Sequence, residues 1–344
     1  MSEDNKMIIA LDAMGGDYAP QEQVKGAVQA VQAEQDIIVK LFGDEDRLRS
    51  ELASCTYDPD RIVIVPTSSI VENCDVPTVA IRKKRDSSMV MGLYALKNGE
   101  ADAFISCGNT GALLVGGQTI VGRIRGVDRA GLAFLVPTLK HPVLLMDCGA
   151  NVDVRPEMLV QFARMGSVYM SSVMGVSNPR VGLVNIGEEE TKGNKLVQET
   201  FPLLKECTDI HFTGSVESRE LTEGTVDIAV CDGFVGNIIL KTYEGVAAAM
   251  LHVVRSSIYA GTASRLGGLL MKKELKKSMK QFSVEEYGGA PMLGLKHFVA
   301  KTHGNSKAPE IRNTILQCRI AVREDISGRI ARSLGQDPTL QPHQ

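Results

Sequence analysis

Short apolar runs alternate with longer amphipathic segments along most of the chain. The apolar runs predict β-strands at 7–11, 37–42, 61–65, 101–106, 132–136, 143–147, 181–186, 209–213 and 226–231. Between most of these runs, apolar residues recur at the i, i+3, i+4 spacing of a helix, as in 21–33, 88–98, 157–174 and 194–206. Strands that alternate with helices indicate βαβ units, whose crossover helices cover both faces of a sheet. The pattern therefore predicts an α/β fold with a mostly parallel sheet.

The periodicity changes in the last third of the chain. Residues 237–282 contain no convincing strand and have the pattern of a nearly continuous helix, with breaks at Gly261 and at Gly267-Gly268. This pattern predicts a projecting helical hairpin, inserted as residues 237–285.

The length of 344 residues and the apolar share of 44% allow a large buried core. No fixed-period repeat, low-complexity tract or long linker marks a boundary. One large α/β domain and two joined lobes both fit this length, and we predict a single domain, residues 1–344, with the hairpin inside it. The stretch 309–333 carries spaced isoleucines among charged residues and predicts one long helix that closes the fold.

Charge and cysteine content exclude several classes of protein. The net charge of −3 gives no reason to expect a nucleic-acid partner, since such proteins usually present a strongly basic face. We expect neither a signal peptide nor a membrane-spanning helix, because no run of 18 apolar residues occurs. The odd number of cysteines and the lack of a C-x-x-C pair argue against a disulfide framework or a zinc site and favour the reducing cytoplasm. The cysteines are Cys55, Cys74, Cys107, Cys148, Cys207, Cys231 and Cys318.

Five predicted strands are followed by loops that combine Gly with Asn or Asp. The loops are DAMGGD (12–17), CGNTGA (107–112), DCGANVD (147–153), GEEETKGN (187–194) and CDGFVGN (231–237). Because the carboxyl ends of parallel strands share one edge of a sheet, we expect these loops to converge on a single crevice. Glycine N–H groups and helix N-termini favour anions, so phosphate is the expected ligand. Any one of these loops is equally an ordinary strand-to-helix connection.

Common phosphate, metal and nucleophile motifs are missing. No two glycines stand two residues apart, which excludes G-x-G-x-x-G, and G-x-x-x-x-G-K-[ST], G-x-S-x-G and H-E-x-x-H do not occur either. We therefore expect neither a nucleotide cofactor nor a metal, and no covalent serine chemistry.

A basic stretch, IRKKRDSSM (81–89), precedes the predicted helix 88–98. Ser87 is the expected N-cap of that helix. The four basic residues fit phosphate binding, contact with an acidic protein, or simply a solvated helix end.

Several motifs, taken together and in order, resemble one protein family. They are LDAMGGD, SCGNTGALL, DCGANVD followed by MLVQFARMGSVYM, NIGEEETKGN, and CDGFVGNIILKTYEG. Over about 7–333 the chain resembles the bacterial phosphate acyltransferase family, PlsX (acyl-acyl carrier protein:phosphate acyltransferases). The resemblance implies that inorganic phosphate attacks the thioester of a long-chain acyl-acyl carrier protein, giving acyl phosphate for phospholipid synthesis. It also implies a homodimer with an α/β/α fold similar to phosphotransacetylases and isocitrate-dehydrogenase-like enzymes, without metal or other cofactor.

Such a reaction needs a desolvated phosphate beside the thioester carbon and donors aimed at the developing oxyanion. Phosphate is itself a nucleophile, so we predict direct attack without an acyl-enzyme. The residues that we predict to act in catalysis are Lys192, Asn237, His303 and Asp232. The residues that we predict to bind phosphate or the acyl substrate are Asp12, Gly15, Gly16, Ser87, Ser88, Gly108, Asn109, Thr110, Gly111, Gly149, Asn151, Gly193, Asn194, Gly233 and Gly236.

Each predicted role has a structural alternative. Lys192 would neutralise phosphate or the oxyanion, or it is a solvated residue in a first helical turn. Asn237 would donate to the oxyanion, or it is an ordinary helix-start residue. His303 would protonate the departing thiolate, or it makes a structural hydrogen bond. Asp12 and Asp232 fit the capping of strand-end N–H groups equally well.

Two further groups lie in the same loops. Asn109 and Thr110 would cap a helix over the phosphate. Cys107, Cys148 and Cys231 stand beside three of the loops, where small buried packing is the expected role, and we assign them no catalytic function.

The segment 265–282, RLGGLLMKKELKKSMKQF, has six positive charges and one negative charge. Its apolar residues form a narrow stripe opposite the lysines. A packed helix with a solvated lysine face and a docking surface for an acidic carrier protein both fit this pattern. The family resemblance implies peripheral membrane association here and favours an anionic membrane surface. The residues that we predict to contact the membrane are Leu270, Met271, Leu275, Met279 and Phe282.

Two alternative functions remain from sequence alone. One is a phosphotransacetylase-like enzyme that uses acyl-CoA, which would not require the basic hairpin. The other is a membrane-recruited interaction protein without activity, which would not require converging Gly/Asn loops.

Overall fold

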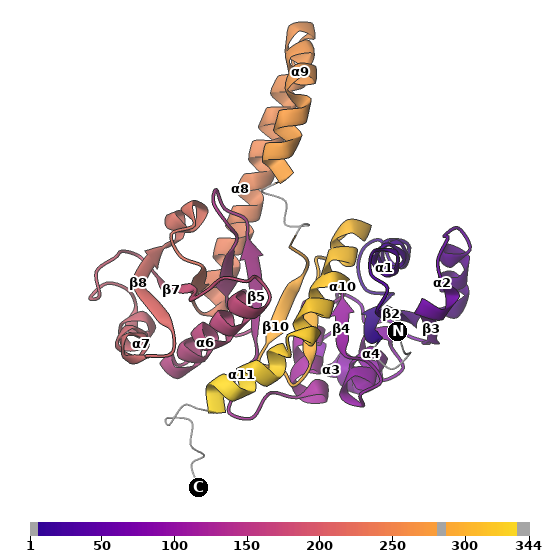
Figure 1. Ribbon diagram of the computed structural model, residues 1–344, viewed down its shortest axis with the longest axis horizontal. Helices are drawn as coiled ribbons and strands as arrows, with labels where there is room; N and C mark the ends of the chain where they lie inside the picture. Colours follow the sequence, from indigo (N-terminus) through magenta and orange to yellow (C-terminus); the bar gives the residue numbers. More distant parts are fainter. Residues whose placement is uncertain (1–5, 281–286, 336–344) are drawn as a thin grey trace.

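The structure is a computed structural model that describes residues 6–280 and 287–335, the side chains of 276–280 excepted. The strands are β1 (Met7–Asp12), β2 (Ile37–Gly43), β3 (Ile62–Pro66), β4 (Ala103–Ser106), β5 (Gly131–Val136), β6 (Val143–Met146), β7 (Arg180–Asn185), β8 (His211–Glu217), β9 (Ile228–Val230), β10 (Ala290–Leu293) and β11 (Phe298–Lys301). They form one sheet in the order β3-β2-β1-β4-β11-β10-β5-β6-β9-β7-β8 (Figure 1). Among the described residues, seven of the ten strand pairs are parallel, which confirms the mostly parallel sheet.

Helices cover both faces of this sheet. They are α1 (Gln21–Ala33), α2 (Glu45–Leu52), α3 (Pro77–Lys83), α4 (Ser88–Lys97), α5 (Thr110–Gly116), α6 (Pro156–Ser172), α7 (Lys195–Glu206), α8 (Gly233–Tyr259), α9 (Thr262–Lys280), α10 (Ala308–Arg323) and α11 (Ile326–Gly335). One apolar core lies under α1, α2, α6, α7, α10 and α11, and a second lies under α3, α4, α5 and the start of α8. In β1, Ile9 and Leu11 belong to the first core and Ala10 to the second. The predicted three-layer α/β/α architecture is therefore confirmed.

Two features of the C-terminal third differ from the sequence prediction. The strands β10 and β11, of four residues each, were not predicted. The predicted long helix 309–333 is wrong, since the chain forms α10 and α11 with a break at Asp325. Asp325 has a positive φ of 48°, a conformation that ends a right-handed helix.

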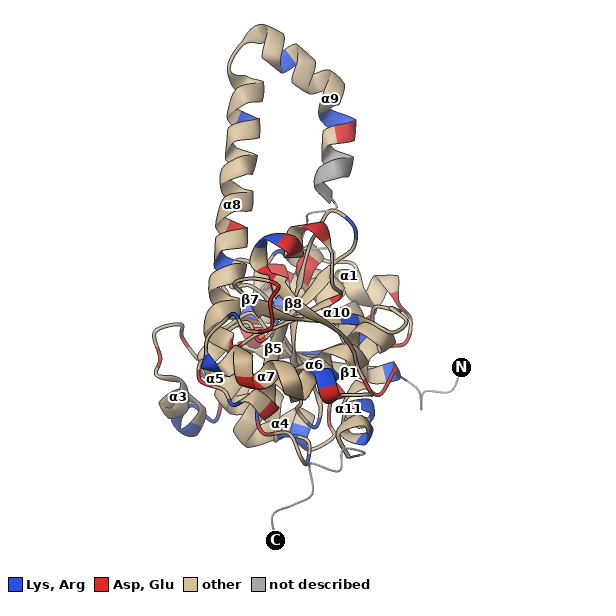
Figure 2. Cartoon of the chain, turned by 90° about the vertical axis from the view of Figure 1, so that its left-hand side faces the viewer, with Lys and Arg blue, Asp and Glu red and all other residues tan. Residues whose placement is uncertain are grey.

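The helices α8 and α9 form the predicted hairpin, which projects from the body of the molecule (Figures 1 and 2). The predicted break at Gly261 is confirmed, because it lies between the two helices. The predicted break at Gly267-Gly268 is wrong, because both residues lie inside α9. A Cβ atom at Gly268 would come within 2.5 Å of the Ile258 side chain, so this glycine allows α9 to pack closely on α8. None of the described helices is long and apolar enough to cross a bilayer.

The two halves of the sheet run in opposite directions. The three antiparallel pairs β11–β10, β10–β5 and β5–β6 reverse the chain, so β6, β9, β7 and β8 run opposite to β1, β4 and β11. The expectation that all five strand-end loops share one edge was therefore wrong. The helix α8 connects the halves, because it starts after β9 and continues to the carboxyl ends of β5 and β11. There the Tyr243 hydroxyl donates to the Pro137 carbonyl oxygen, and Glu244 contacts His303.

Candidate active site

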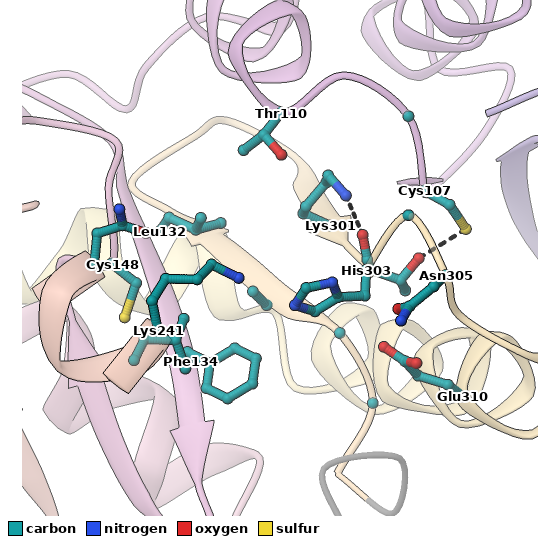
Figure 3. A pocket seen from close by; sticks show the side chains of 18 of the residues that line it. Cys107, Thr110, Leu132, Phe134, Cys148, Lys241, Lys301, His303, Asn305 and Glu310 are labelled. Atoms are coloured by element: carbon teal, nitrogen blue, oxygen red, sulfur yellow. Dashed lines mark hydrogen bonds between the residues drawn. The ribbon is translucent and has the colours of Figure 1, made fainter. Parts of the chain in front are cut away.

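A cavity of about 470 Å³ opens between α8, β5 and the loops after β4 and β11 (Figure 3). Four of the five predicted loops contribute to its wall, through Asp17, through Cys107, Gly108 and Thr110, through Cys148, and through Asn237. Leu132, Phe134 and Leu240 form an apolar side, and the side chains of Lys241, Lys301 and His303 form a basic side. The cavity therefore suits a ligand with one apolar and one anionic part.

Asp12 organises the first two loops rather than facing the cavity. It is buried, and its carboxylate accepts hydrogen bonds from the Ser106 hydroxyl at 2.7 Å and the Gly15 N–H at 3.1 Å. The Ser106 hydroxyl in turn accepts the Gly108 N–H at 3.0 Å. A Cβ atom at Gly15 would lie 2.6 Å from the Asp12 carboxylate, so only glycine fits there. Burial raises the pKa of Asp12, and these donors act in the opposite direction.

The second buried aspartate, Asp147, has the same role in the other half. Its carboxylate accepts the N–H groups of Leu132, Gly149, Ala150 and Asn151, and the Asn151 side chain donates to it at 2.8 Å. Burial raises the pKa of Asp147, against these donors. This carboxylate therefore fixes the loop on which the first turn of α8 rests.

Two glycines allow that first turn of α8 to approach the loop. A Cβ atom at Gly236 would lie 1.9 Å from the Asp147 carbonyl oxygen, and one at Gly233 would lie 2.7 Å from the Asn151 carbonyl oxygen. The Asp232 side chain caps α8 by accepting the N–H groups of Phe234 and Val235, both at 2.9 Å. This packing brings Asn237, one turn further along, into the cavity wall.

The loop after β4 carries the predicted helix cap. The Asn109 side chain accepts the Ala112 N–H at 3.0 Å at the start of α5, and its amide donates to the Glu72 carbonyl oxygen at 3.0 Å. Gly108 and Thr110, on either side of Asn109, line the cavity. Gly111 packs against Pro77, which a Cβ atom would approach to 2.7 Å.

Of the predicted substrate residues around 81–89, Ser87 caps α4, and both Ser87 and Ser88 are buried. In the basic stretch, Lys84 pairs with Asp75 at 2.6 Å, and its three basic neighbours are exposed. Within the described chain, no residue of 81–89 lines the cavity.

Lys301, at the end of β11, is the most unusual group in the cavity. It is only 8% exposed, and its ammonium donates to the neighbouring Thr302 carbonyl oxygen. No carboxylate of the described residues lies within ion-pair distance of it. Burial lowers the pKa of Lys301. A buried ammonium without an anionic partner is costly, so this site favours an anionic ligand.

Three polar side chains, Lys241, Glu244 and His303, meet between α8 and the loop after β11. The Glu244 carboxylate lies 2.7 Å from the Lys241 ammonium and 3.0 Å from Nε2 of His303. Figure 3 shows the Lys241 and His303 side chains extending toward one another in the cavity. His303 therefore lies in the cavity wall, where its predicted catalytic role requires it.

The loop 187–194 lies apart from this cavity, and it contributes no lining residue in the described part of the chain. The Lys192 ammonium lies 2.7 Å from the Glu189 carboxylate, and its side chain is half exposed. Asn194 caps α7 by accepting the Val197 N–H, and Gly193 has a positive φ of 101°. The catalytic role of Lys192 stays a prediction.

The hairpin carries the predicted membrane-contact residues. Leu270 and Met271 are exposed, at 79% and 62%, and so are Leu266 and Leu269. Leu275 is partly buried. Met279 and Phe282 lie outside the residues whose side chains the structure describes.

Sequence reasoning missed Lys241 and Lys301 of the basic side, and it missed Glu244, which contacts His303. Lys241 follows Asn237 by four residues and therefore shares its helix face, and Glu244 is one turn further along. Lys301 ends the unpredicted strand β11 and precedes Thr302. Recognising FVAK as a strand would have shown a further strand-end loop.

The fold places the protein in the class of three-layer α/β/α proteins, with a cavity lined from both halves of the sheet. Its structure is similar to that of the EutD phosphotransacetylase from Staphylococcus aureus, with a TM-score of 0.59, 16% identity and coverage of 93% of this chain and 94% of that chain. A phosphotransacetylase from Streptococcus pyogenes gives a TM-score of 0.64 at the same identity and coverage. These likenesses concern the fold.

Sequence similarity identifies the family. The family model described as "Fatty acid synthesis protein" matches residues 7–329. The chain is 45% identical over 328 residues to a phosphate acyltransferase from Clostridium perfringens, covering 95% of this chain and 97% of the relative. It is 46% identical over 329 residues to one from Clostridium botulinum, covering 96% and 98%. The chain belongs to the phosphate acyltransferase family, PlsX, and is an acyltransferase. The resemblance drawn from the motifs is confirmed, and membership of an enzyme family argues against an inactive interaction protein.

Proposed function

We propose that the protein converts a long-chain acyl-acyl carrier protein and inorganic phosphate into acyl phosphate and free carrier protein for phospholipid synthesis. The observation that carries this proposal is the two-sided cavity, which is lined both by apolar residues and by the buried Lys301, whose ammonium has no ion pair with a carboxylate of the described residues. Phosphate supplies the missing negative charge beside Lys301, and the apolar wall accommodates the acyl group.

The thioester carbonyl lies between these two sides in our proposal. Asn237 lines the cavity from the first turns of α8, where its amide is available as a donor to the developing oxyanion. Lys241 lies one turn further along the same helix and adds positive charge on the phosphate side.

Direct attack by phosphate is favoured over a cysteine-bound acyl intermediate. Burial raises the pKa of Cys107 to about 11, although the Thr302 hydroxyl donates to its sulfur at 2.7 Å. Burial likewise raises the pKa of Cys148 and of Cys231 well above the usual value. Because the thiolate is the nucleophilic form, these buried thiols are poor acyl acceptors at neutral pH.

Peripheral membrane association through the hairpin is a second part of the proposal. Leu266, Leu269, Leu270 and Met271 are exposed on α9, next to basic residues (Figure 2). Such a surface suits an anionic membrane interface. The double substitution Leu270→Glu/Met271→Glu should abolish sedimentation with anionic vesicles, whereas Leu139→Glu, at an equally exposed leucine on the body, should not. Unchanged sedimentation of the hairpin variant contradicts the anchor.

The resemblance also supports a homodimer in the cytoplasm at the membrane surface. Light scattering on the purified protein measures the mass directly, and a monomer of 37.2 kDa contradicts the dimer. The carrier-protein partner is tested together with the reaction.

The reaction is tested by incubating the protein with phosphate and palmitoyl-acyl carrier protein and trapping acyl phosphate with hydroxylamine. We expect hydroxamate that depends on phosphate, and its absence contradicts the proposal. A parallel reaction with palmitoyl-CoA tests the acyl-CoA alternative, which faster turnover of the CoA substrate would favour.

A further inference from the structure

The contact between Glu244 and His303 joins two segments that are far apart in the sequence. Glu244 is on α8, three turns from the start of that helix, and His303 is in the loop after β11. The Glu244 side chain is 27% exposed, and its two oxygens contact different partners, Nε2 of His303 at 3.0 Å and the Lys241 ammonium at 2.7 Å. The hydrogen bonds from His303 and Lys241 lower the pKa of Glu244 despite the opposing effect of burial. The carboxylate is therefore ionised at neutral pH.

An ionised carboxylate can only accept hydrogen bonds, which determines the state of the histidine ring. Nε2 of His303 must carry the proton that it donates to Glu244. In the neutral ring the other nitrogen, Nδ1, then has a free lone pair. His303 lines the cavity, where this nitrogen can accept a proton from a ligand.

We infer that Glu244 is a positioning residue, which holds His303 with the proton on Nε2 so that Nδ1 carries a proton from the attacking phosphate to the leaving sulfur. The inference rests on the proposed function. Hydrogen phosphate forms a bond from oxygen to the acyl carbon and gives its proton to Nδ1. The carbon–sulfur bond breaks, and the thiolate of the carrier protein takes that proton from Nδ1. The products are acyl phosphate and the free thiol, with no net uptake or release of protons.

This arrangement also assigns a second task to Glu244. By pairing with Lys241 it sets the position of the ammonium beside the cavity. The other charged groups that line the cavity around His303 are Lys301 from β11, Asp17 from the loop after β1 and Glu310 from α10. Glu244 lies within hydrogen-bond distance of Nε2, at 3.0 Å, and can therefore control the histidine ring directly.

The first test is kinetic and uses Glu244→Gln, His303→Asn and the double variant in the hydroxamate assay. We expect each single substitution to lower kcat by about 100-fold, the lower end of the range of general acid–base catalysis, and the double variant to be no slower than His303→Asn alone. Glu244→Asp should recover part of the loss. The matched control is Glu45→Gln, which removes a surface carboxylate paired with Arg49 on α2 and should leave kcat unchanged.

Rescue by Glu244→Asp separates a positioning role from a merely structural one, because the shorter carboxylate can still accept the proton of Nε2. Additive losses in the double variant, or no rescue by Glu244→Asp, would overturn the inference.

The second test does not depend on activity. With six histidines in the chain, ¹⁵N-histidine NMR can identify the His303 signals by their loss in His303→Asn. We expect the Nε2-protonated form in the unsubstituted protein and a mixture of forms in Glu244→Gln. The Nδ1-protonated form in the unsubstituted protein would overturn the inference. Lack of hydroxamate with the unsubstituted protein would instead contradict the proposed reaction, so the two failures are distinguishable.

Discussion

Two lysines follow or end strands of the sheet, and one is buried in the cavity while the other is exposed to solvent. Lys301 ends β11 inside the cavity, 8% exposed, with no carboxylate of the described residues in ion-pair contact. Lys192 follows β7 on an exposed loop and pairs with Glu189 at 2.7 Å. Burial lowers the pKa of Lys301, whereas the hydrogen bond with Glu189 raises the pKa of Lys192.

A loop with a recognisable Gly/Asn motif therefore need not be the place where a lysine is buried without an ion-pair partner. The 187–194 loop has a clear Gly/Asn pattern, but its lysine is already neutralised. The end of β11 has no such pattern, but the burial of Lys301 favours binding of an anion. The substitutions below test this difference between Lys301 and Lys192.

The largest effect is expected for Lys301→Met, which keeps the length of the side chain and removes its charge. We expect kcat/KM for phosphate to fall by about 1,000-fold, because a desolvated cation beside the transferred group stabilises developing charge strongly. Thermal unfolding should show no loss of stability, since the variant buries an apolar group instead of a charge. A fall of less than threefold would exclude Lys301 from the phosphate site.

Asn237→Ala should have the next largest effect. We expect kcat to fall by about 100-fold with little change in KM, the pattern for loss of a donor that acts on the oxyanion. The hydroxamate assay measures this, and Asn194→Ala, which removes the cap of α7 outside the cavity, is the control. Near-normal turnover would show that Asn237 has only a structural role at the start of α8.

The lowered pKa of Lys301 predicts a basic limit to phosphate use. Above that pKa the side chain is neutral, so kcat/KM for phosphate should decline about tenfold per pH unit. The decline should begin below the ordinary lysine pKa of about 10.4, because burial disfavours the charged form. Lys301→Arg, whose charge persists, should not show it. The same decline in Lys301→Arg would show that the titration of another group causes the loss of activity.

A smaller effect is expected for Lys192→Ala if the loop keeps the position described. We expect KM for phosphate to rise by about threefold with unchanged kcat, since an exposed, paired lysine contributes only to the long-range field. The motif-based prediction of a direct catalytic role demands instead a loss of about 100-fold in kcat. That larger loss would show that the 187–194 loop reaches the cavity during turnover.

Cys107→Ala should have the smallest effect. We expect turnover within about twofold of the unsubstituted protein, because a thiol with a pKa near 11 is not the nucleophile. Mass spectrometry after incubation with palmitoyl-acyl carrier protein should find no acylated cysteine. Loss of activity together with an acyl adduct would favour a covalent route.

Much of the fold follows from local patterns. The alternation of apolar runs with helical spacing predicts nine strands close to their observed places, and Ser87 and Asn109 cap helices as their residue types predict. The direction of the strands in the sheet could not be predicted in this way, because it depends on three antiparallel pairings that have no local signal in the sequence. That is why the loops were expected on one edge.

The candidate site was predictable only in part. Asn237 lines the cavity, as its place in a strand-end loop suggested, and His303 lines it too. Asp12 and Asp147 show why such loops carry buried carboxylates. The pairing of Glu244 with His303 could not be predicted, since it depends on how far α8 extends across the sheet. Lys301 is a candidate for phosphate binding because it is buried, and its burial depends on the fold and could not be predicted from the sequence.

The central claim is that phosphate binds at Lys301 and not at Lys192. Isothermal titration calorimetry with inorganic phosphate alone tests it on the unsubstituted protein, Lys301→Met and Lys192→Met. We predict that Lys301→Met weakens phosphate binding by at least about tenfold, as expected for removal of a buried charge partner, while Lys192→Met weakens it by no more than about threefold. Retained binding in Lys301→Met together with lost binding in Lys192→Met would contradict the account.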